Sequence, residues 1–316
     1  MPVKELQHFL SELGWLSNEE VLSTRIPGEG NMNVVIQVTT DSRSFILKQS
    51  RPYVNKYQQI AAPAERIETE YQFYQATNNT ALKASMPQLL AYSQEHYLMM
   101  LTYVEGFEDM TRLYADGAVT AGEVADLTKL LNEVHLAAVP AGYPENRELR
   151  QLNHQHIFVL PFLQDNGFEL DDVQTGLQAL SQPYKADAAL KEKIDHLGQL
   201  YLSSGDILLH GDYYPGSWMR ADGRFYVIDT EFSFSGFREF DIGVMIAHLI
   251  MVTSDKSMLE QVLRHTTADP DVELVQQIAG VEIMRRLIGL AQLPLTRTLD
   301  EKRQLLQLAY QLIMSS

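Results

Sequence analysis

The chain has 316 residues, 45% of them hydrophobic and 21% charged, which is ordinary for a globular protein that buries a large core. It contains no cysteine, which excludes disulfides, zinc-thiolate sites and thiol catalysis and favours a reducing cytoplasm. A formal net charge of −16 argues against a nucleic-acid partner, because phosphate binding needs clustered Lys and Arg. No apolar run has the length of a signal peptide core or a membrane span, so we expect a soluble protein with no membrane partner.

The first hundred residues have the pattern of a small antiparallel sheet. Residues 3–13 carry apolar side chains at helical spacing and predict a short amphipathic helix, and a second helix is expected over residues 63–76. Five segments read as strands, namely residues 21–26, 34–38, 45–48, 88–92 and 97–101. We therefore predict an N-terminal lobe, residues 1–101, with a five-stranded antiparallel sheet plus a helix.

The apolar pattern changes to a helical period in the second part of the chain. Residues 102–106 are expected to connect the two parts, and residues 102–316 to form a mostly helical C-terminal lobe. Helices are expected over residues 120–138, 173–180, 188–202, 242–253, 272–292 and 299–314. The predicted fold class is α+β, with two lobes.

Two carboxylates of the C-terminal lobe follow apolar runs. Asp212 lies in a His-x-Asp loop, and Asp229 ends the run of Val227 and Ile228. A single triplet of this kind is more often a capped turn, in which the Asp satisfies loop amides. Two such carboxylates, however, match the needs of phosphoryl transfer, where one accepts the proton of the attacking hydroxyl and another holds Mg²⁺ on the nucleotide phosphates. The pattern therefore favours a kinase that uses ATP and Mg²⁺.

The N-terminal lobe contains features that fit the nucleotide. Gly28 and Gly30, beside Asn31, lie between two expected strands, where a flexible backbone can close over phosphates, although such a turn is more often only a hairpin. Lys48 ends the third strand, where kinases keep the lysine that binds the α- and β-phosphates, while the alternative is a solvated lysine. The helix over residues 63–76 offers three carboxylates as partners for this lysine, namely Glu65, Glu68 and Glu70.

Three segments, residues 210–217, 229–243 and 280–291, resemble the aminoglycoside phosphotransferase and choline kinase superfamily. Within it the motifs are most similar to those of the methylthioribose kinases, and the resemblance extends over about residues 26–293. It implies a protein-kinase-like fold with the nucleotide in a cleft between the lobes.

The resemblance also implies roles for particular residues. Asp212 would be the catalytic base and Asp229 the main magnesium ligand, with Glu231 as an auxiliary metal or substrate contact. Ser217 would also be an auxiliary ligand; it stands where the superfamily commonly has Asn, which puts a second protein-bound metal in doubt. Glu70 would be the partner of Lys48, with Glu68 as the alternative.

Backbone groups of the connection between the lobes would bind the adenine, namely those of Thr102, Tyr103 and Val104. The superfamily equivalents of His210 and Asp241 brace the catalytic loop, and Asp241 is expected to open a helix, where a carboxylate also serves as a cap.

Two neighbouring arginines lie in the penultimate helix. Arg285 falls in its apolar stripe, so its buried guanidinium needs a carboxylate or phosphate partner, with Glu231 as the nearest candidate by resemblance. Arg286 lies four residues after Glu282, a spacing that by itself fits a simple surface ion pair. The pair Arg285 and Arg286 also resembles two arginines of the methylthioribose kinases, which implies a position near the active site. We expect Arg285 to act on the acceptor side of the site.

The predicted function is transfer of the γ-phosphate of ATP to a hydroxyl of a small molecule, with a sugar such as methylthioribose as the first candidate. The alternatives are an aminoglycoside, choline or a homoserine-type acceptor, for which the acidic charge would suit a cationic substrate, or a pseudokinase that binds nucleotide without transferring phosphate. A homodimer is compatible with the sequence.

Overall fold

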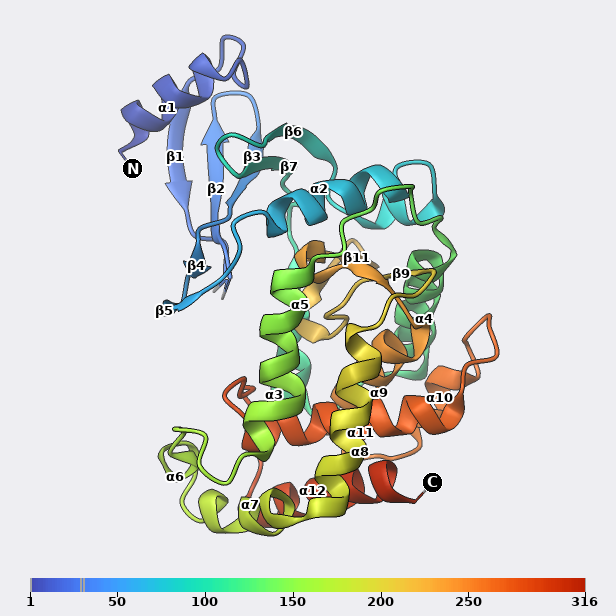
Figure 1. The fold of residues 1–316 in the computed structure, drawn as a ribbon. Helices are drawn as coiled ribbons and strands as arrows, with labels where there is room; N and C mark the ends of the chain where they lie inside the picture. The colour runs from blue at the N-terminus through green and yellow to red at the C-terminus, as the bar shows by residue number, and fades with distance from the viewer. Residues whose placement is uncertain (1, 29, 31, 316) are drawn as a thin grey trace.

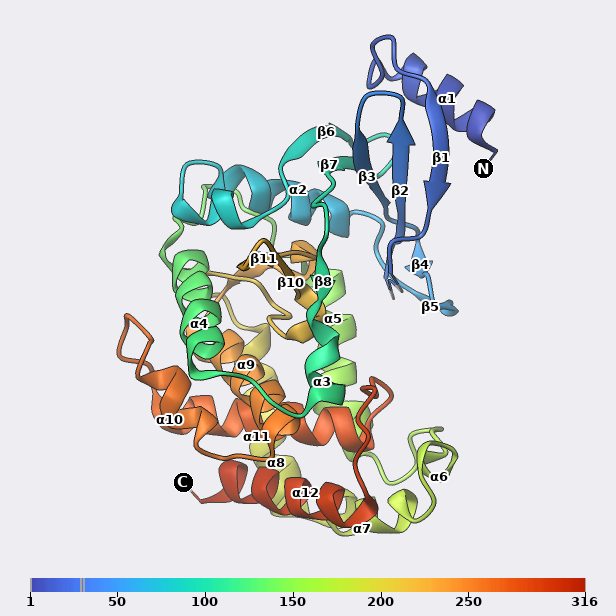
Figure 2. The same ribbon diagram turned by 180° about the vertical axis from the view of Figure 1, so that it is seen from behind.

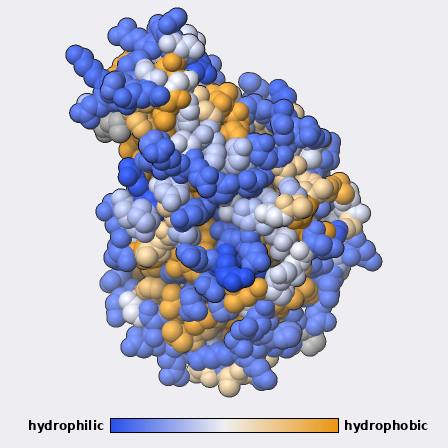
Figure 3. All heavy atoms as spheres, turned by 45° about the horizontal axis from the view of Figure 1, so that its top comes forward, coloured by the Kyte–Doolittle hydropathy of each residue, from blue (hydrophilic) through white to orange (hydrophobic). Residues whose placement is uncertain are grey.

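The structure is a computed structural model that describes residues 2–28, 30 and 32–315. It has a small lobe built on a sheet and a larger helical lobe, joined by the end of one strand and the segment after it (Figure 1). The space-filling view shows the same division, with the smaller lobe projecting from a broader and mostly hydrophilic body (Figure 3). Asn31, predicted to contact the nucleotide, lies outside the described residues.

The sheet of the small lobe is antiparallel and has the strand order β1-β2-β3-β7-β6. Its strands are β1 (Val21–Arg25), β2 (Val34–Thr40), β3 (Ser44–Gln49), β6 (Leu89–Ser93) and β7 (Leu98–Thr102). Helix α1 (Val3–Glu12) packs against one end of this sheet, and Leu6 and Leu10 join a small core with Val38 and Phe45. The predicted five-stranded sheet and first helix are therefore confirmed.

Helix α2 (Arg66–Thr77) lies between the sheet and the helical lobe (Figures 1 and 2). Its residues Ile67 and Phe73 belong to the main apolar core, together with Met99 and Leu101 from β7 and most of the buried residues of the helical lobe. One face of the sheet thus shares a core with the C-terminal lobe. The boundary proposed near residue 102 coincides with the last residue of β7.

A short hairpin precedes α2 and was not predicted. It consists of β4 (Tyr53–Val54) and β5 (Tyr57–Ala61). Four of the five residues of β5 are exposed, so the hairpin lacks the alternation of buried and exposed side chains that would mark strands in the sequence.

The helical lobe is organised around α9 (Arg238–Thr253), of which thirteen residues are buried. A helix that is apolar on all sides must lie inside the domain, and α9 packs against α11 (Val272–Ile288), which in turn packs against α12 (Leu299–Met314). The other helices are α3 (Leu113–Asp116), α4 (Ala121–Leu136), α5 (Arg147–His154), α6 (Leu170–Val173), α7 (Leu177–Ala186), α8 (Ala188–Leu202) and α10 (Met258–Leu263). No described helix combines the length and apolar character that crossing a bilayer requires.

Short strands hold the loops that carry the two predicted carboxylates. Strand β9 (Ile207–Leu209) pairs with β12 (Phe234–Gly236). Strand β10 (Trp218–Ala221) pairs with both β11 (Arg224–Val227) and β8 (Glu108–Asp109). The loop with Asp212 follows β9 and the turn with Asp229 follows β11, so both carboxylates emerge from strand ends, as the sequence predicts.

Candidate active site

A cleft between the lobes gathers most of the residues predicted to bind the nucleotide. Its walls include apolar side chains from both lobes, namely Val35, Ile46, Leu101 and Ile228. The predicted residues that line it are Gly28, Gly30, Lys48, Glu70, Thr102, Tyr103, Val104 and Asp229. An apolar slot that ends in charged groups matches the two parts of a nucleotide, the base and the phosphates.

Lys48 lies at the inner end of this cleft and bridges two carboxylates. Its Nζ is 2.7 Å from Oε2 of Glu70 and 2.6 Å from Oδ1 of Asp229. Glu70 is therefore the partner of Lys48, as predicted, whereas Glu68 hydrogen-bonds to Gln72 and Tyr92. Three elements far apart in the sequence, β3, α2 and the turn after β11, meet at this lysine.

The charges around Lys48 support one another electrostatically. Burial alone would lower the pKa of Lys48, but Asp229, Glu70 and Glu231 outweigh burial and raise this pKa, so the ammonium keeps its charge. Burial raises the pKa of Glu70 to about 7, although Lys48 pulls it down. The side chain of Asp229 is 48% exposed, whereas that of Glu70 is 1% exposed. Of the two carboxylates that pair with Lys48, Asp229 is therefore the one accessible from the cleft.

The loop with Asp212 is shaped by contacts of its backbone. Gly211 has a φ of +84°, and a Cβ at this position would lie 2.1 Å from the carbonyl oxygen of Phe232, so only glycine fits. Asp241 accepts hydrogen bonds from the amides of His210 and Gly211 at 2.8 and 2.9 Å. Because α9 begins at Arg238, Asp241 does not open the helix as expected but braces the loop from within its first turn.

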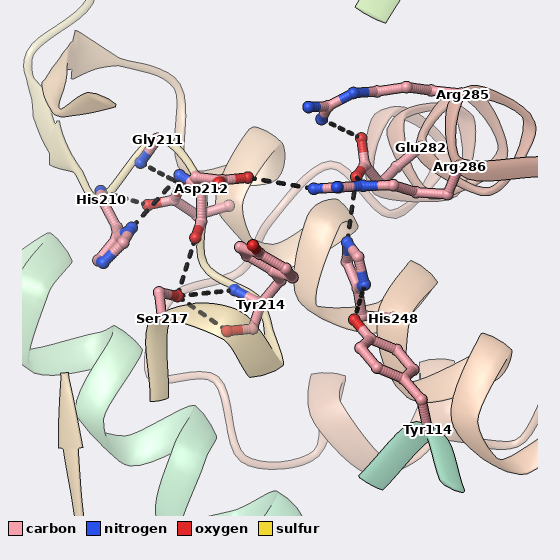
Figure 4. A network of polar contacts seen from close by, with 11 residues as sticks. Tyr114, His210, Gly211, Asp212, Tyr214, Ser217, His248, Glu282, Arg285 and Arg286 are labelled. Atoms are coloured by element: carbon pink, nitrogen blue, oxygen red, sulfur yellow. Dashed lines mark hydrogen bonds and ion pairs between the residues drawn. The ribbon is translucent and has the colours of Figure 1, made fainter. Parts of the chain in front are cut away.

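Asp212 itself is largely buried and faces α11. Its Oδ1 lies 3.4 Å from Nη2 of Arg286, and no described residue is a partner of its Oδ2 (Figure 4). Burial raises the pKa of Asp212 to about 6, although Arg286 and Arg285 pull it down. A carboxylate with this pKa is ionised at neutral pH and is still basic enough to accept a proton.

The geometry of Ser217 does not support its interpretation as a magnesium ligand. Its hydroxyl donates to the carbonyl oxygens of Asp212 and Tyr214 at 2.9 and 2.8 Å and accepts from the amide of Tyr214 at 3.0 Å (Figure 4). The residue is buried and does not line the cleft. Ser217 therefore closes the catalytic loop, a role that its short polar side chain suits.

Glu231 is likewise engaged away from the cleft. It is buried and its Oε2 lies 2.8 Å from Nε of Arg66, the first residue of α2. The expectation that Glu231 is the partner of Arg285 is wrong, because Glu231 pairs with Arg66. Its auxiliary contact with a metal or substrate stays a prediction, and Glu231 is not among the residues that line the cleft. Arg66 also donates to Asn33 Oδ1 and to the carbonyl of Met32, so it joins the glycine-containing loop to the turn after Asp229.

The two arginines of α11 share one carboxylate, Glu282. Its Oε2 lies 2.8 Å from Nη1 of Arg285, and its Oε1 lies 2.6 Å from Nε of Arg286 (Figure 4). The interpretation of Arg286 as a surface residue is wrong, because it is buried, and it is Arg286 whose hydrogen bond reaches Asp212. The buried guanidinium of Arg285 has the carboxylate partner that the sequence argument required, but that partner is three residues away in the same helix.

Sequence reasoning missed Glu282 as a site residue, and with it His248 and Tyr114, which lie behind it. A polar His within the otherwise apolar run of residues 242–252 was the only signal available for His248. The residues described contain no cluster of three or more His, Asp or Glu side chains able to hold a metal ion. A carboxylate oxygen of Asp229 is nevertheless the kind of ligand that Mg²⁺ takes when the phosphates of a nucleotide supply the others.

The fold is of the protein-kinase-like class, with one lobe built on an antiparallel sheet, a helical lobe, and a cleft lined by residues of both. Among solved structures, this chain is similar over 99% of its length to a spectinomycin phosphotransferase, with a TM-score of 0.60 and 13% identity over 98% of that chain. It is also similar to the choline kinase LicA of Streptococcus pneumoniae, with a TM-score of 0.54 and 14% identity over 99% of both chains.

The chain belongs to the phosphotransferase enzyme family, whose model matches residues 23–274. Its relatives include the methylthioribose kinase of Exiguobacterium sibiricum, which is 29% identical over 75% of this chain and 63% of that protein. The methylthioribose kinase of Bacillus velezensis is 25% identical over 89% of this chain and 82% of that protein. The match thus spans less than two thirds of the first of these relatives.

Proposed function

We propose that this protein transfers the γ-phosphate of ATP to a hydroxyl group of methylthioribose or a closely similar sugar. The observation that carries the proposal is the position of Lys48, which is buried between Glu70 and Asp229 at the inner end of the cleft. A lysine held this way is aimed at nucleotide phosphates, and the fixed carboxylate beside it serves a metal ion.

The nucleotide half of the site follows from the cleft. The apolar walls would take the adenine ring, with backbone groups of Thr102, Tyr103 and Val104 as its hydrogen-bond partners. Gly28 and Gly30 would lie over the phosphates, and Lys48 would contact the α- and β-phosphates. Asp229 would hold Mg²⁺, which neutralises charge that develops on the phosphates when it is bound.

The acceptor half of the site centres on Asp212. Its Oδ1 faces Arg286 and its Oδ2 is available to the acceptor, so the carboxylate can take the proton of the attacking hydroxyl as the oxygen–phosphorus bond forms. Arg285 remains our candidate for the acceptor side, because its charge lies near enough to Asp212 to lower the pKa of that carboxyl. A guanidinium can donate to an acceptor hydroxyl or to a transferred phosphoryl oxygen.

The choice of methylthioribose rests on the two named kinases, and the other acceptors are competing outcomes of one experiment. ADP formation from ATP and Mg²⁺ is measured with methylthioribose, ribose, choline, homoserine and kanamycin, each over a range of concentrations. We expect methylthioribose to have the highest kcat/KM, and Asp212→Asn to abolish transfer to it. Preference for choline or kanamycin would overturn the acceptor, and nucleotide binding without transfer to any compound would indicate a pseudokinase.

A further inference from the structure

A line of hydrogen bonds runs behind the catalytic loop and ends at Asp212 (Figure 4). It begins at the hydroxyl of Tyr114 in α3, which contacts Nδ1 of His248 in α9. Nε2 of His248 lies 3.0 Å from Oε1 of Glu282 in α11, and the same oxygen accepts from Nε of Arg286. Nη2 of Arg286 then reaches Asp212 at 3.4 Å. The first four residues of this line are at least nine-tenths buried, so water does not compete for their hydrogen bonds.

The direction of each hydrogen bond follows from the chemistry of the groups. Burial would raise the pKa of Glu282, but Arg285 and Arg286 hold it well below its usual range, so the carboxylate is ionised and only accepts. Nε2 of His248 must therefore carry the hydrogen, and Nδ1 is then free to accept from Tyr114. Burial lowers the pKa of His248 to about 4, which keeps the ring neutral. A neutral His adds no charge, so His248 contributes by orienting the carboxylate of Glu282 through its hydrogen bond.

One further contact holds the guanidinium of Arg286. It lies over the ring of Tyr214, 4.8 Å from the ring centroid, and that ring packs against His248 with centroids 4.9 Å apart. The carboxylate of Glu282 fixes one edge of the guanidinium and Tyr214 fixes one face, so the remaining N–H groups point toward the catalytic loop (Figure 4).

We infer that Tyr114 and His248 are positioning residues for the transfer reaction: they fix Glu282, and through it Arg286, so that Arg286 holds one oxygen of Asp212 and leaves the other for the acceptor hydroxyl. This inference rests on the proposed function. Neither residue is among those that line the cleft.

The inference predicts how Asp212 titrates when the line is broken. Arg286 and Arg285 lower the pKa of Asp212, whereas Glu282 and Asp229 raise it. Other titratable groups that interact with Asp212 are Tyr114, Tyr201 and Tyr214. Loss of the hydrogen bond from His248 leaves Glu282 and Arg286 less well ordered, so Arg286 moves from Asp212 and the pKa of Asp212 rises.

The test compares His248→Leu, His248→Gln and Tyr114→Phe with the wild-type enzyme. The Gln amide replaces Nε2–H and can still donate to Glu282, whereas Leu cannot. Tyr310→Phe is the matched control, because it likewise removes a tyrosine hydroxyl that donates a hydrogen bond, in this case to Asp187. Tyr310 lies in α12, away from this line of hydrogen bonds. Two readouts are used, the pH dependence of kcat and kcat/KM, and the titration of Asp212 by carboxyl carbon-13 NMR in the nucleotide-free protein.

For His248→Leu we expect kcat to fall roughly tenfold with little change in the KM for ATP, which is the effect of losing one hydrogen bond to a charged group. The NMR pKa of Asp212 and the acidic limb of the pH profile should both rise by about 1. Tyr114→Phe should show a smaller rise, His248→Gln should restore most of the loss, and Tyr310→Phe should show neither effect.

An unchanged pKa of Asp212 in both Tyr114→Phe and His248→Leu would overturn the inference. Since Tyr114→Phe removes a single oxygen atom, it keeps the test decisive even when His248→Leu does not fold. Failure of the proposed function looks different: the wild-type enzyme then phosphorylates no acceptor, while the NMR titration still reports whether the line positions Arg286 against Asp212.

Discussion

Asp212 and Asp229 are both carboxylates near the cleft, but their surroundings suit different tasks. The side chain of Asp212 is 19% exposed and faces Arg286, whereas that of Asp229 is 48% exposed and faces Lys48. We expect Asp212→Asn to abolish turnover and leave MgATP affinity nearly intact, because the base does not hold the nucleotide. Asp229→Ala should abolish turnover and also weaken MgATP binding.

Isothermal titration calorimetry with a non-hydrolysable ATP analogue and Mg²⁺ measures this difference. The exposed Asp206, changed to Ala, is the matched control and should bind as the wild-type protein does. Equal affinities of the Asp212 and Asp229 variants would contradict the assignment of roles.

The pKa of Asp212 predicts how activity depends on pH. A general base must be ionised, and burial raises the pKa of this carboxyl to about 6, so kcat/KM should fall as the pH falls below about 6. The profile is measured at saturating MgATP over pH 5–9, with separate tests of enzyme stability at each pH. An acidic limb near pH 4 would mean that Asp212 titrates as an exposed carboxylate and lacks the surroundings described above.

The same pKa also affects stability, but in the opposite direction: activity should rise with pH, whereas the contribution of Asp212 to stability should fall. The folded protein keeps a proton on Asp212 up to about pH 6, whereas the unfolded chain releases it near 3.8, the ordinary pKa of an aspartate side chain. This stabilising contribution is complete at low pH and is lost as the pH rises through that window, at a cost of roughly 2–3 kcal/mol. The Tm of Asp212→Asn relative to the wild type should therefore increase between pH 4 and pH 7, as measured by calorimetry.

A substitution of Ser217 can distinguish its two possible roles, namely holding the backbone of the loop and binding Mg²⁺. Its hydroxyl accepts from the amide of Tyr214 and shares its one hydrogen between the carbonyl oxygens of Asp212 and Tyr214, so Ser217→Ala should lower kcat and reduce stability by about 1–2 kcal/mol. The loss should be the same at every Mg²⁺ concentration. A variant rescued by high Mg²⁺ would restore the interpretation of Ser217 as a metal ligand.

At the scale of single residues, the sequence predicted those site residues whose position depends on the neighbouring apolar segment of the chain. Lys48 at a strand end and Asp212 after an apolar run can be read from spacing, and the choice of Glu70 followed from family resemblance. The partners of Arg285 and Glu231 could not be read in this way, because each buried charge had several possible counterions. The pair of Glu282 with Arg286 follows from their spacing of four residues in α11, whereas the pair of Arg66 with Glu231 depends on how α2 packs against the turn after Asp229.

At the scale of elements, α2 links the glycine-containing loop and the turn after Asp229, the two segments proposed to lie at the phosphates. Arg66 donates to carbonyls of residues 32, 51 and 63 and pairs with Glu231, so one buried side chain holds the glycine-containing loop and the turn after Asp229 together. We expect Arg66→Met to destabilise the protein by about 3–5 kcal/mol, because it removes the ion-pair partner that lies 2.8 Å from the buried Glu231.

Urea denaturation of three variants tests this account. Arg66→Met combined with Glu231→Gln removes both charges and should recover part of the stability. Arg43→Met is the matched control, because Arg43 forms an ion pair with Glu19 at the surface and should matter by less than about 1 kcal/mol. If the double variant is no more stable than Arg66→Met alone, the carbonyl contacts of Arg66 matter more than its charge pair.

The predicted elements agree with the structure where the apolar pattern is long and regular, as in α4, α8 and α12. The elements missed are short, and α10 and the β4–β5 hairpin each have few buried residues. The start of α9 was placed four residues late, because residues 238–241 are mostly charged and gave no apolar period. Tertiary contacts, and not local preference, set those boundaries.

At the scale of the whole molecule, the cleft lies between the sheet and the helical lobe, so a nucleotide bound there contacts both. MgADP at one hundred times its Kd should stabilise the folded protein by about 2.7 kcal/mol, since it binds only the folded state. Differential scanning calorimetry should show this gain as a rise in Tm. Lys48→Met should reduce the rise strongly, whereas Lys56→Met, which changes an exposed lysine of the β4–β5 hairpin, should keep it. Equal rises in both variants would contradict a phosphate contact by Lys48.

The two oxygen atoms of Glu282 are shared by three partners, Arg285, Arg286 and His248, and Arg286 in turn contacts Asp212. Substitutions within such a group do not add, because each one changes the partner that the others need. The change in activity of a variant of Arg285 alone therefore includes the effect of a rearranged Glu282 as well as the loss of the guanidinium. Laboratory evolution toward a new acceptor would accordingly change these positions in combinations, with single substitutions passing through less active intermediates.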